Sequence, residues 1–272
     1  QMCIRDRAQS SLIICIGERS SSRTFISLNI FINSVKTFLF IIYYETRKKS
    51  MTEVKGFLRD FRLSVPEAIY TCNGIKICGR RIKSVLFSTD VSIIRNSNAD
   101  AVIAVYPFTP QPVITQAVMM AADTPVFVGI GGGLTKGERV LGLGRHAEYQ
   151  GAFGVVVNAP TPNSTVKELK EALDIPVIVT VVSEEDDIAG RLEAGAEIFN
   201  VSAASKTPEL IEKIRKEYPD IPIMATGGPT DETIKATIAA GANAVTWTPP
   251  TNGEVFKDIM DAYRKHQEHP TY

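Results

Sequence analysis

Two acidic residues stand where proton-transfer chemistry could occur, each just after an apolar run that is typical of a β-strand. Asp90 follows the run "KSVLFST", and Glu184 follows "PVIVTVVS". A carboxylate held at the end of a strand can accept or donate a proton during catalysis. Either residue could instead begin a helix, because acidic side chains favour the first helical turn. We take Asp90 and Glu184 as the candidate catalytic residues.

Three further polar residues interrupt or end apolar runs and could orient a ligand. Asn158 ends the run "FGVVVNAP", while Asn200 and Ser202 lie within "EIFNVSAAS". Burying such side chains costs free energy unless they are hydrogen-bonded. We therefore expect Asn158, Asn200 and Ser202 to face a bound molecule.

The stretch "MATGGPTDET" at 224–233 predicts a phosphate site. Gly227 and Gly228 would let backbone N–H groups approach an anion, and the start of the following helix adds a favourable dipole. Thr226 and Thr248, at the ends of the last two apolar runs, complete the predicted site. The alternative is a tight turn with no ligand. The neighbouring "TPPTN" also supplies two prolines, which lack an N–H donor.

Other motifs exclude several classes of site. The loop "GIGGGLTKGE" at 129–138 fits neither the P-loop nor the dinucleotide-binding pattern, although it could bind an anion or simply be solvated. The three histidines are scattered, so no metal site held by histidines is predicted. No nucleophile-elbow pattern occurs either.

The elements that must position these residues follow a regular rhythm. Nearly continuous apolar runs alternate with amphipathic segments, which is typical of buried parallel strands joined by helices. Some runs begin after Asp-x-Pro and others after Gly-Ala, and the two kinds alternate. Pro176 and Pro222 are 46 residues apart, as are Gly195 and Gly241. Eight such runs after Lys83 predict an α/β protein, a single compact (β/α)8 barrel, with its site at the carboxyl ends of the strands.

The first fifty residues differ from the remainder. "QMCIRDR" resembles translated sequencing adaptor, and the apolar segment that follows is interrupted by Lys36 before it reaches the roughly 20 residues of a membrane span. We expect residues 1–50 to be a non-native or disordered N-terminal extension. Residues 51–272 would form the barrel domain, with 51–82 as an N-terminal cap and 83–272 as the barrel.

Composition limits the possible partners. The chain has 30 basic and 30 acidic residues, so it lacks the basic excess of a nucleic-acid-binding surface. Its four cysteines show no C-x-x-C spacing, which favours reduced thiols in the cytoplasm. We expect a cytoplasmic protein with no membrane or nucleic-acid partner, which could form a homodimer through its outer helices.

The motifs "TGG" and "AGANAV" within 226–245 are similar to the seventh- and eighth-strand region of the ribulose-phosphate-binding barrels. This aldolase-type superfamily includes 2-keto-3-deoxy-6-phosphogluconate aldolase, N-acetylmannosamine-6-phosphate epimerase and thiamine-phosphate synthase. The resemblance implies that the glycines after strand seven and the loop after strand eight hold a substrate phosphate. It departs at the sixth strand, where the aldolase has its Schiff-base lysine and this chain has Asn200 and Ser202.

Three functions fit these observations. The first is a lyase or isomerase that acts on a small phosphorylated, sugar-like metabolite without a cofactor. The second is an FMN-dependent oxidoreductase barrel, because such barrels also hold a phosphate after strands seven and eight. The third is a barrel that binds a ligand without chemistry, since few acidic or basic residues fall at inner strand positions.

Overall fold

The computed structural model describes residues 62–270. The predicted extension at 1–50 and the first part of the predicted cap lie outside the described residues.

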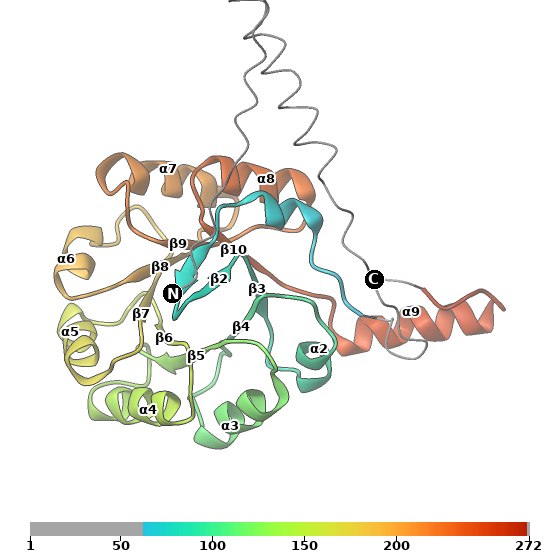
Figure 1. The fold of residues 1–272 in the computed structure, drawn as a ribbon, viewed down its shortest axis with the longest axis horizontal. Helices are drawn as coiled ribbons and strands as arrows, with labels where there is room; N and C mark the ends of the chain where they lie inside the picture. The colour runs from blue at the N-terminus through green and yellow to red at the C-terminus, as the bar shows by residue number, and fades with distance from the viewer. Residues whose placement is uncertain (1–61, 271–272) are drawn as a thin grey trace, which may run out of the picture. The chain divides into compact units, whose positions relative to one another are not determined.

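Eight parallel strands close into a barrel, in which the last strand pairs with the first (Figure 1). The prediction of a (β/α)8 barrel is confirmed. The strands are β3 (Ser84–Phe87), β4 (Ala101–Ala104), β5 (Val126–Gly131), β6 (Gly154–Val157), β7 (Val177–Val181), β8 (Ile198–Val201), β9 (Ile223–Thr226) and β10 (Ala244–Trp247).

Helices follow the strands and surround them. Polar side chains cap several helices, and proline stands in the first turn of two of them, where no N–H is needed. The helices are α2 (Val91–Arg95), α3 (Pro112–Ala121), α4 (Glu138–Tyr149), α5 (Asn163–Ala172), α6 (Ile188–Glu193), η2 (Ala204–Lys206), α7 (Thr207–Glu217), α8 (Asp231–Ala239) and α9 (Asn252–Arg264).

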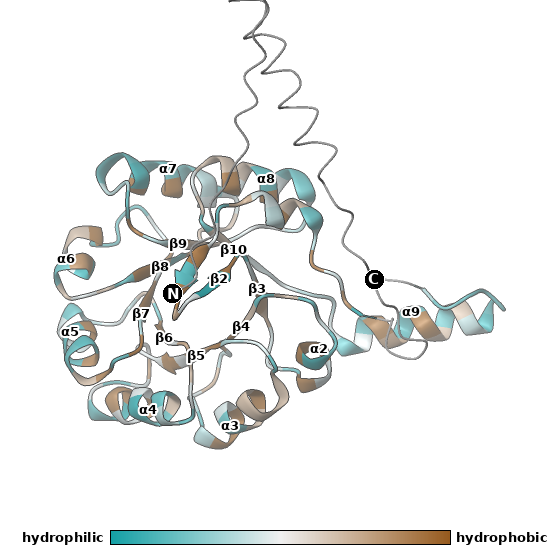
Figure 2. Cartoon of the chain, viewed as in Figure 1, coloured by the Kyte–Doolittle hydropathy of each residue, from teal (hydrophilic) through white to brown (hydrophobic). Residues whose placement is uncertain are grey.

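Alternate side chains of each strand enter two different cores, because successive residues point to opposite faces. One core fills the barrel interior. The other lies between the strands and the helices, and Figure 2 shows apolar strands inside a ring of helices with hydrophilic outer faces. The interior core comprises Ile75, Ile77, Ile82, Val85, Ala101, Ile103, Phe127, Val156, Ile178, Ile198, Met224 and Ala244.

A small hairpin closes the amino-terminal end of the barrel. Strands β1 (Ile75–Ile77) and β2 (Arg80–Ile82) pair antiparallel, and their isoleucines join the interior core. The hairpin leads directly into β3. Because its isoleucines pack into the interior core, it covers the amino-terminal end of the barrel. The opposite end, at the carboxyl ends of the strands, is left for ligands.

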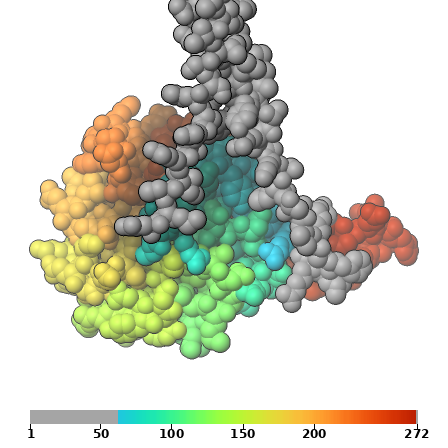
Figure 3. Space-filling view, viewed as in Figure 1, coloured from blue at the N-terminus to red at the C-terminus, as the bar shows by residue number. Residues whose placement is uncertain are grey.

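The segment before this hairpin completes the outer ring of helices. η1 (Glu67–Thr71) packs beside α8, and Leu63 donates its backbone N–H to Asn96 O, just after α2, at 2.8 Å. Leu63, Val65 and Ile69 are buried in the outer core. α9 lies outside the ring and stands out from the side of the barrel (Figure 1 and Figure 3).

The interior core predicts a large difference between two phenylalanines. Phe127 is fully buried inside the barrel, whereas Phe108 is 75% exposed. Phe127→Ala should lower the free energy of unfolding by about 3–5 kcal/mol, because it leaves a cavity. Phe108→Ala should change it by less than about 0.5 kcal/mol. Urea denaturation of both variants measures this, and equal losses would contradict the assignment of Phe127 to the core.

Candidate functional site

The mouth of the barrel, at the carboxyl ends of the strands, brings together most of the predicted site residues. Asn158 follows β6, Ser202 follows β8, and Thr248 follows β10. Asn200 is the second-last residue of β8, and Thr226 is the last residue of β9. The carboxyl ends of parallel strands meet at one end of a closed barrel, so these side chains surround a common space.

Polar side chains line the inside of the mouth on one half of the barrel. Phe199 and Val201 of β8 point into the outer core, so Asn200 between them points into the barrel. The same alternation turns one or two residues of each neighbouring strand inward. We call this set the inner polar arc: Thr180, Asn200, Ser202, Thr226 and Thr246.

Hydrogen bonds satisfy the inner polar arc only in part. Asn200 Nδ2 donates to Thr180 Oγ1 at 3.4 Å, and Thr226 Oγ1 donates to Ser202 Oγ at 3.2 Å. Asn200 Oδ1 and Thr246 Oγ1 are buried and have no hydrogen-bond partner among the described residues. An unsatisfied buried polar group costs about 1–3 kcal/mol. The arc therefore offers a donor and an acceptor to a polar ligand.

Sequence reasoning missed Thr180 and Thr246. Thr246 is 6% exposed and is paired in register with Thr226, and Thr180 is paired with Asn200. Threonine is common in strands, so neither residue stands out in the sequence. Their positions could have revealed them, because both stand at alternate positions of their apolar runs that face the barrel interior.

Asp90 is the N-cap of α2. Its Oδ1 accepts from the backbone N–H groups of Ser92 at 2.8 Å and Ile93 at 3.3 Å, and from Ser92 Oγ at 2.7 Å. The bond from the Ser92 hydroxyl, helped by the two backbone bonds, lowers the pKa of Asp90 below its ordinary value. Asp90 is ionised at neutral pH, and its Oδ2 has no partner among the described residues.

Glu184 lies on the outer side of its loop. Its carboxylate pairs with Lys213 of α7 at 3.0 Å, and both side chains are about half exposed. The hydrogen bond from Lys213 lowers the pKa of Glu184. The loop itself is ordered by Asp186, whose Oδ2 accepts from the N–H groups of Val182 and Ser183 at 2.8 and 3.0 Å. Glu184 is therefore placed for an exposed ion pair.

The two glycines after β9 are required by the turn and by packing. Gly228 has φ +78°, and a Cβ there would lie 2.6 Å from Thr233 Oγ1. A Cβ on Gly227 would lie 2.5 Å from Val245 Cγ1, and its N–H donates to Thr246 O at 3.2 Å. Their small size thus has a local cause. The N–H of Gly228 makes no hydrogen bond within the described residues and is the one of the two that could contact an anion.

The helix N-termini near this turn already hold carboxylates of the chain. Glu254 accepts from Thr251 N at 2.7 Å and Thr251 Oγ1 at 2.8 Å at the start of α9, and these bonds lower the pKa of Glu254. Its own backbone N–H and the Thr230 hydroxyl lower the pKa of Glu232 at the start of α8. These exposed carboxylates would compete with a bound phosphate at both helix starts, which makes Gly228 and nearby hydroxyls the stronger candidates for phosphate contacts.

The loop that carries Asn158 is held by a buried arginine. The guanidinium of Arg191 on α6, which is 8% exposed, contacts the carbonyl oxygens of Ala159 and Thr161 and donates to Asn163 Oδ1 at 3.0 Å. The Thr161 side chain packs against Gly132, where a Cβ would lie 1.7 Å from Thr161 Oγ1. Glycine at 132 therefore allows the loop after β5 to pack against the loop after β6. This packing role was not predicted from the sequence.

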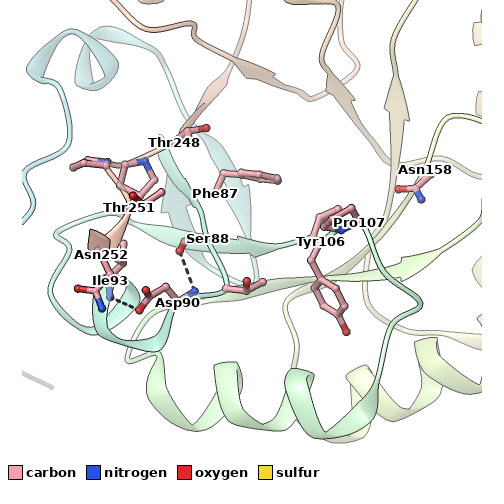
Figure 4. Close-up of a pocket in the computed structure, with 14 residues that line it drawn as sticks. Phe87, Ser88, Asp90, Ile93, Tyr106, Pro107, Asn158, Thr248, Thr251 and Asn252 are labelled. Atoms are coloured by element: carbon pink, nitrogen blue, oxygen red, sulfur yellow. Dashed lines mark hydrogen bonds between the residues drawn. The ribbon is translucent and has the colours of Figure 1, made fainter. Parts of the chain in front are cut away.

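A cavity of about 590 Å³ opens on the other half of the mouth, between β3, β4 and the loop after β10 (Figure 4). It includes three of the predicted site residues: Asp90, Asn158 and Thr248. Its remaining lining comprises Phe87, Ser88, Thr89, Ile93, Val105, Tyr106, Pro107, Pro249, Pro250, Thr251 and Asn252.

Two kinds of feature are absent from residues 62–270. No group of three or more His, Cys, Asp or Glu side chains is arranged to bind a metal ion. None of the helices described there has the length and hydropathy to cross a bilayer.

No family model matches the chain, and no curated protein matches it. It resembles a solved phosphonopyruvate hydrolase, with a TM-score of 0.54 and 15% identity, over 74% of this chain and 85% of that one. It also resembles a phosphoenolpyruvate phosphomutase from Streptomyces platensis subsp. rosaceus, with a TM-score of 0.52 and 13% identity, over 69% of this chain and 85% of that one. Both neighbours are named as enzymes, and these likenesses show the barrel fold. The resemblance to ribulose-phosphate-binding barrels stays a prediction.

The cap made by Asp90 predicts a pH-dependent contribution to stability. Asp90→Ala should lower the free energy of unfolding by about 1 kcal/mol at neutral pH, because it removes the acceptor at the start of α2. The folded-state pKa of Asp90 is depressed, so its contribution is present above the unfolded-state pKa and is lost as pH falls through the folded-state value.

Thermal denaturation of wild type, Asp90→Ala and Asp90→Asn at neutral and acidic pH measures this contribution. The asparagine variant is the control, since asparagine is also a good N-cap and does not titrate. A difference between wild type and Asp90→Ala that stays constant down to about pH 2 would contradict the role of the ionised carboxylate.

Proposed function

We propose that the chain is an enzyme of the lyase or isomerase class that acts on a small phosphorylated metabolite at the mouth of the barrel. The inner polar arc supports this proposal, above all because Asn200 Oδ1 and Thr246 Oγ1 are buried and find no partner within residues 62–270. Buried polar groups in native proteins are nearly always hydrogen-bonded, and exceptions call for an explanation. A polar substrate that bonds to both oxygens supplies one.

The substrate would lie across the arc with its phosphate near the turn after β9. The free N–H of Gly228 and the hydroxyls of Thr226 and Thr248 would contact the phosphate. Asn200, Ser202 and Thr246 would bind the polar body of the metabolite. Asn158, fixed from the opposite side by the loop that Arg191 holds, would contact its far end.

Asp90 is the stronger candidate for proton transfer. It lies in the wall of the cavity, and its Oδ2 has no partner among the described residues. The hydrogen bonds that lower its pKa keep it ionised at neutral pH but also make it a weaker base. Removal of a proton next to a carbonyl group is common to many lyases and isomerases, and it requires a base within hydrogen-bond reach of the proton. Glu184 remains the second candidate, and its ion pair with Lys213 turns it toward α7.

The charge that develops on the substrate would be stabilised by neutral donors. The inner polar arc contains hydroxyl and amide groups and no lysine, so a Schiff base is not part of this proposal. Oriented neutral donors in a site shielded from water can stabilise an enolate-like oxygen by several kcal/mol. Asn200 Nδ2 and the Ser202 hydroxyl are the donors that we assign to this task.

A barrel that binds a ligand without chemistry is the second candidate function. It is favoured by one observation: the inner polar arc carries no side chain that titrates near neutral pH. Such a protein would be stabilised by its ligand and would show no turnover. The FMN-dependent barrel stays a prediction from the sequence, and the same binding experiment tests it.

The experiment is thermal denaturation of the full chain against a panel of sugar phosphates, their unphosphorylated counterparts, inorganic phosphate and FMN. A ligand at about 100 times its dissociation constant adds about 2.7 kcal/mol of stability. We expect stabilisation by a phosphorylated member and little by its unphosphorylated counterpart. FMN as the sole stabilising compound would replace this proposal with the oxidoreductase.

Variants of the arc show where the ligand binds. Thr226→Val should abolish the shift. Thr237→Val is the control, because Thr237 is a buried threonine on α8, outside the inner polar arc, whereas Thr226 is half-buried at the end of β9. Substitution of Gly228 would be uninformative, since any side chain there strains the turn. Exchange of a substrate hydrogen for solvent deuterium, lost in Asp90→Asn, would indicate an enzyme, and its absence in wild type would favour the binding protein.

A further inference from the structure

We infer that the cavity between β3, β4 and the loop after β10 binds an apolar, uncharged or cationic group of the substrate, and that Asp90 excludes a second anionic group. This inference deepens the proposed function and rests on it in one respect, since the rest of the substrate is assigned to the inner polar arc. The site would thus accept a phosphorylated metabolite that carries an alkyl or aryl group and reject a sugar bisphosphate.

The surface of this cavity is largely apolar. Phe87 ends β3 at the inward parity and is 39% exposed, although large aromatic side chains gain most from burial. Tyr106 and Pro107 follow β4, and Pro249 and Pro250 follow β10. In Figure 4, Phe87 lies between Thr248 and Tyr106. A planar or branched apolar group placed here would cover exposed carbon on three neighbouring elements.

The size of the cavity fits a small-molecule ligand. Its volume of about 590 Å³ lies within the 300–1,000 Å³ of typical ligand pockets. Thr248 and Asn158 lie at its border with the inner polar arc, so a molecule could contact the cavity and the arc together. Contiguous exposed apolar surface of this kind commonly marks a binding site.

The charge of the lining selects against anions. Among the described residues that line the cavity there is no lysine, arginine or histidine, and Asp90 is ionised with its Oδ2 unpartnered. Pro249 and Pro250 have no N–H to offer, so the donors left to the lining are neutral side chains such as Ser88, Thr89 and Asn252. An anionic group beside Asp90 would meet its carboxylate with no positive charge in the lining to offset the repulsion.

Three probes with one phenyl group and different charge test this inference: 2-phenylethanol, phenethylamine and phenylacetate. Their binding to the full chain is measured by NMR titration at neutral pH. We expect the alcohol and the amine to bind and phenylacetate to bind at least about tenfold more weakly, which corresponds to about 1.4 kcal/mol. None of the probes carries phosphate, so the result does not depend on the phosphate site.

Three variants show where the probes bind and what excludes the anion. Phe87→Ala should weaken binding of 2-phenylethanol by about tenfold or more. Phe256→Ala is the matched control, since Phe256 is 61% exposed on α9 and does not line the cavity, and it should leave binding unchanged. Asp90→Asn should bring phenylacetate to within about threefold of the alcohol, because the repulsion is removed while the N-cap is kept.

Equal binding of phenylacetate and 2-phenylethanol to the wild type would overturn the inference, as would full retention of binding in Phe87→Ala. Absence of binding by all three probes at millimolar concentrations would also overturn it. If no sugar phosphate stabilises the chain but the three phenyl probes bind as expected, the proposed function is overturned. The assignment of the cavity would then still stand.

Discussion

Closure of the barrel, through pairing of its last strand with its first, is the constraint on which the remaining structure depends. Val245 N donates to Lys83 O at 2.8 Å, and the register of the pair runs from Val245 opposite Ser84 to Trp247 opposite Leu86. The start of β3 is fixed further by Asp100, whose Oδ2 accepts from Lys83 N and Ser84 N. A closed ring leaves no strand edge and turns alternate residues of every strand inward. The interior core and the mouth are both consequences of that alternation.

The mouth is chemically divided because the strands end differently on its two halves. Near the carboxyl ends of β7 to β10 the inward side chains are threonine, asparagine and serine, which form the inner polar arc. At the ends of β3 and β4 the corresponding positions carry Phe87, Val105 and Tyr106. A molecule that satisfies both halves must have a hydrogen-bonding part and an apolar part. Asp90 stands on the apolar side with an ionised carboxylate, so proton transfer and charge selection would both depend on one residue.

The alternation of apolar runs and amphipathic segments was sufficient to predict the barrel fold. Polar residues within or at the ends of apolar runs were sufficient to predict that Asn200, Ser202 and Thr226 lie at the barrel mouth. Other features depend on contacts between residues distant in the chain. The ion pair of Glu184 with Lys213 joins a loop to a helix 29 residues later. The need for glycine at 227 comes from Val245 on the next strand. The helix after the eighth strand, α9, lies outside the ring, and the segment with η1 packs beside α8 instead. The sequence does not predict this exchange, because the segment with η1 is short and has no helical period.

The segment at 63–71 links the assembly of the barrel to the order of its synthesis. Its apolar residues precede the first barrel strand, yet η1 packs beside α8, which lies far along the chain. Leu63 and Val65 bond to Asn96 and Asn98, which are made soon after them, whereas η1 meets α8, and β3 pairs with β10, only after those distant residues have been made. Contacts of such long sequence separation slow folding. The packing of η1 on the outer ring and the closure of the strands therefore both depend on contacts between the first and last parts of the barrel.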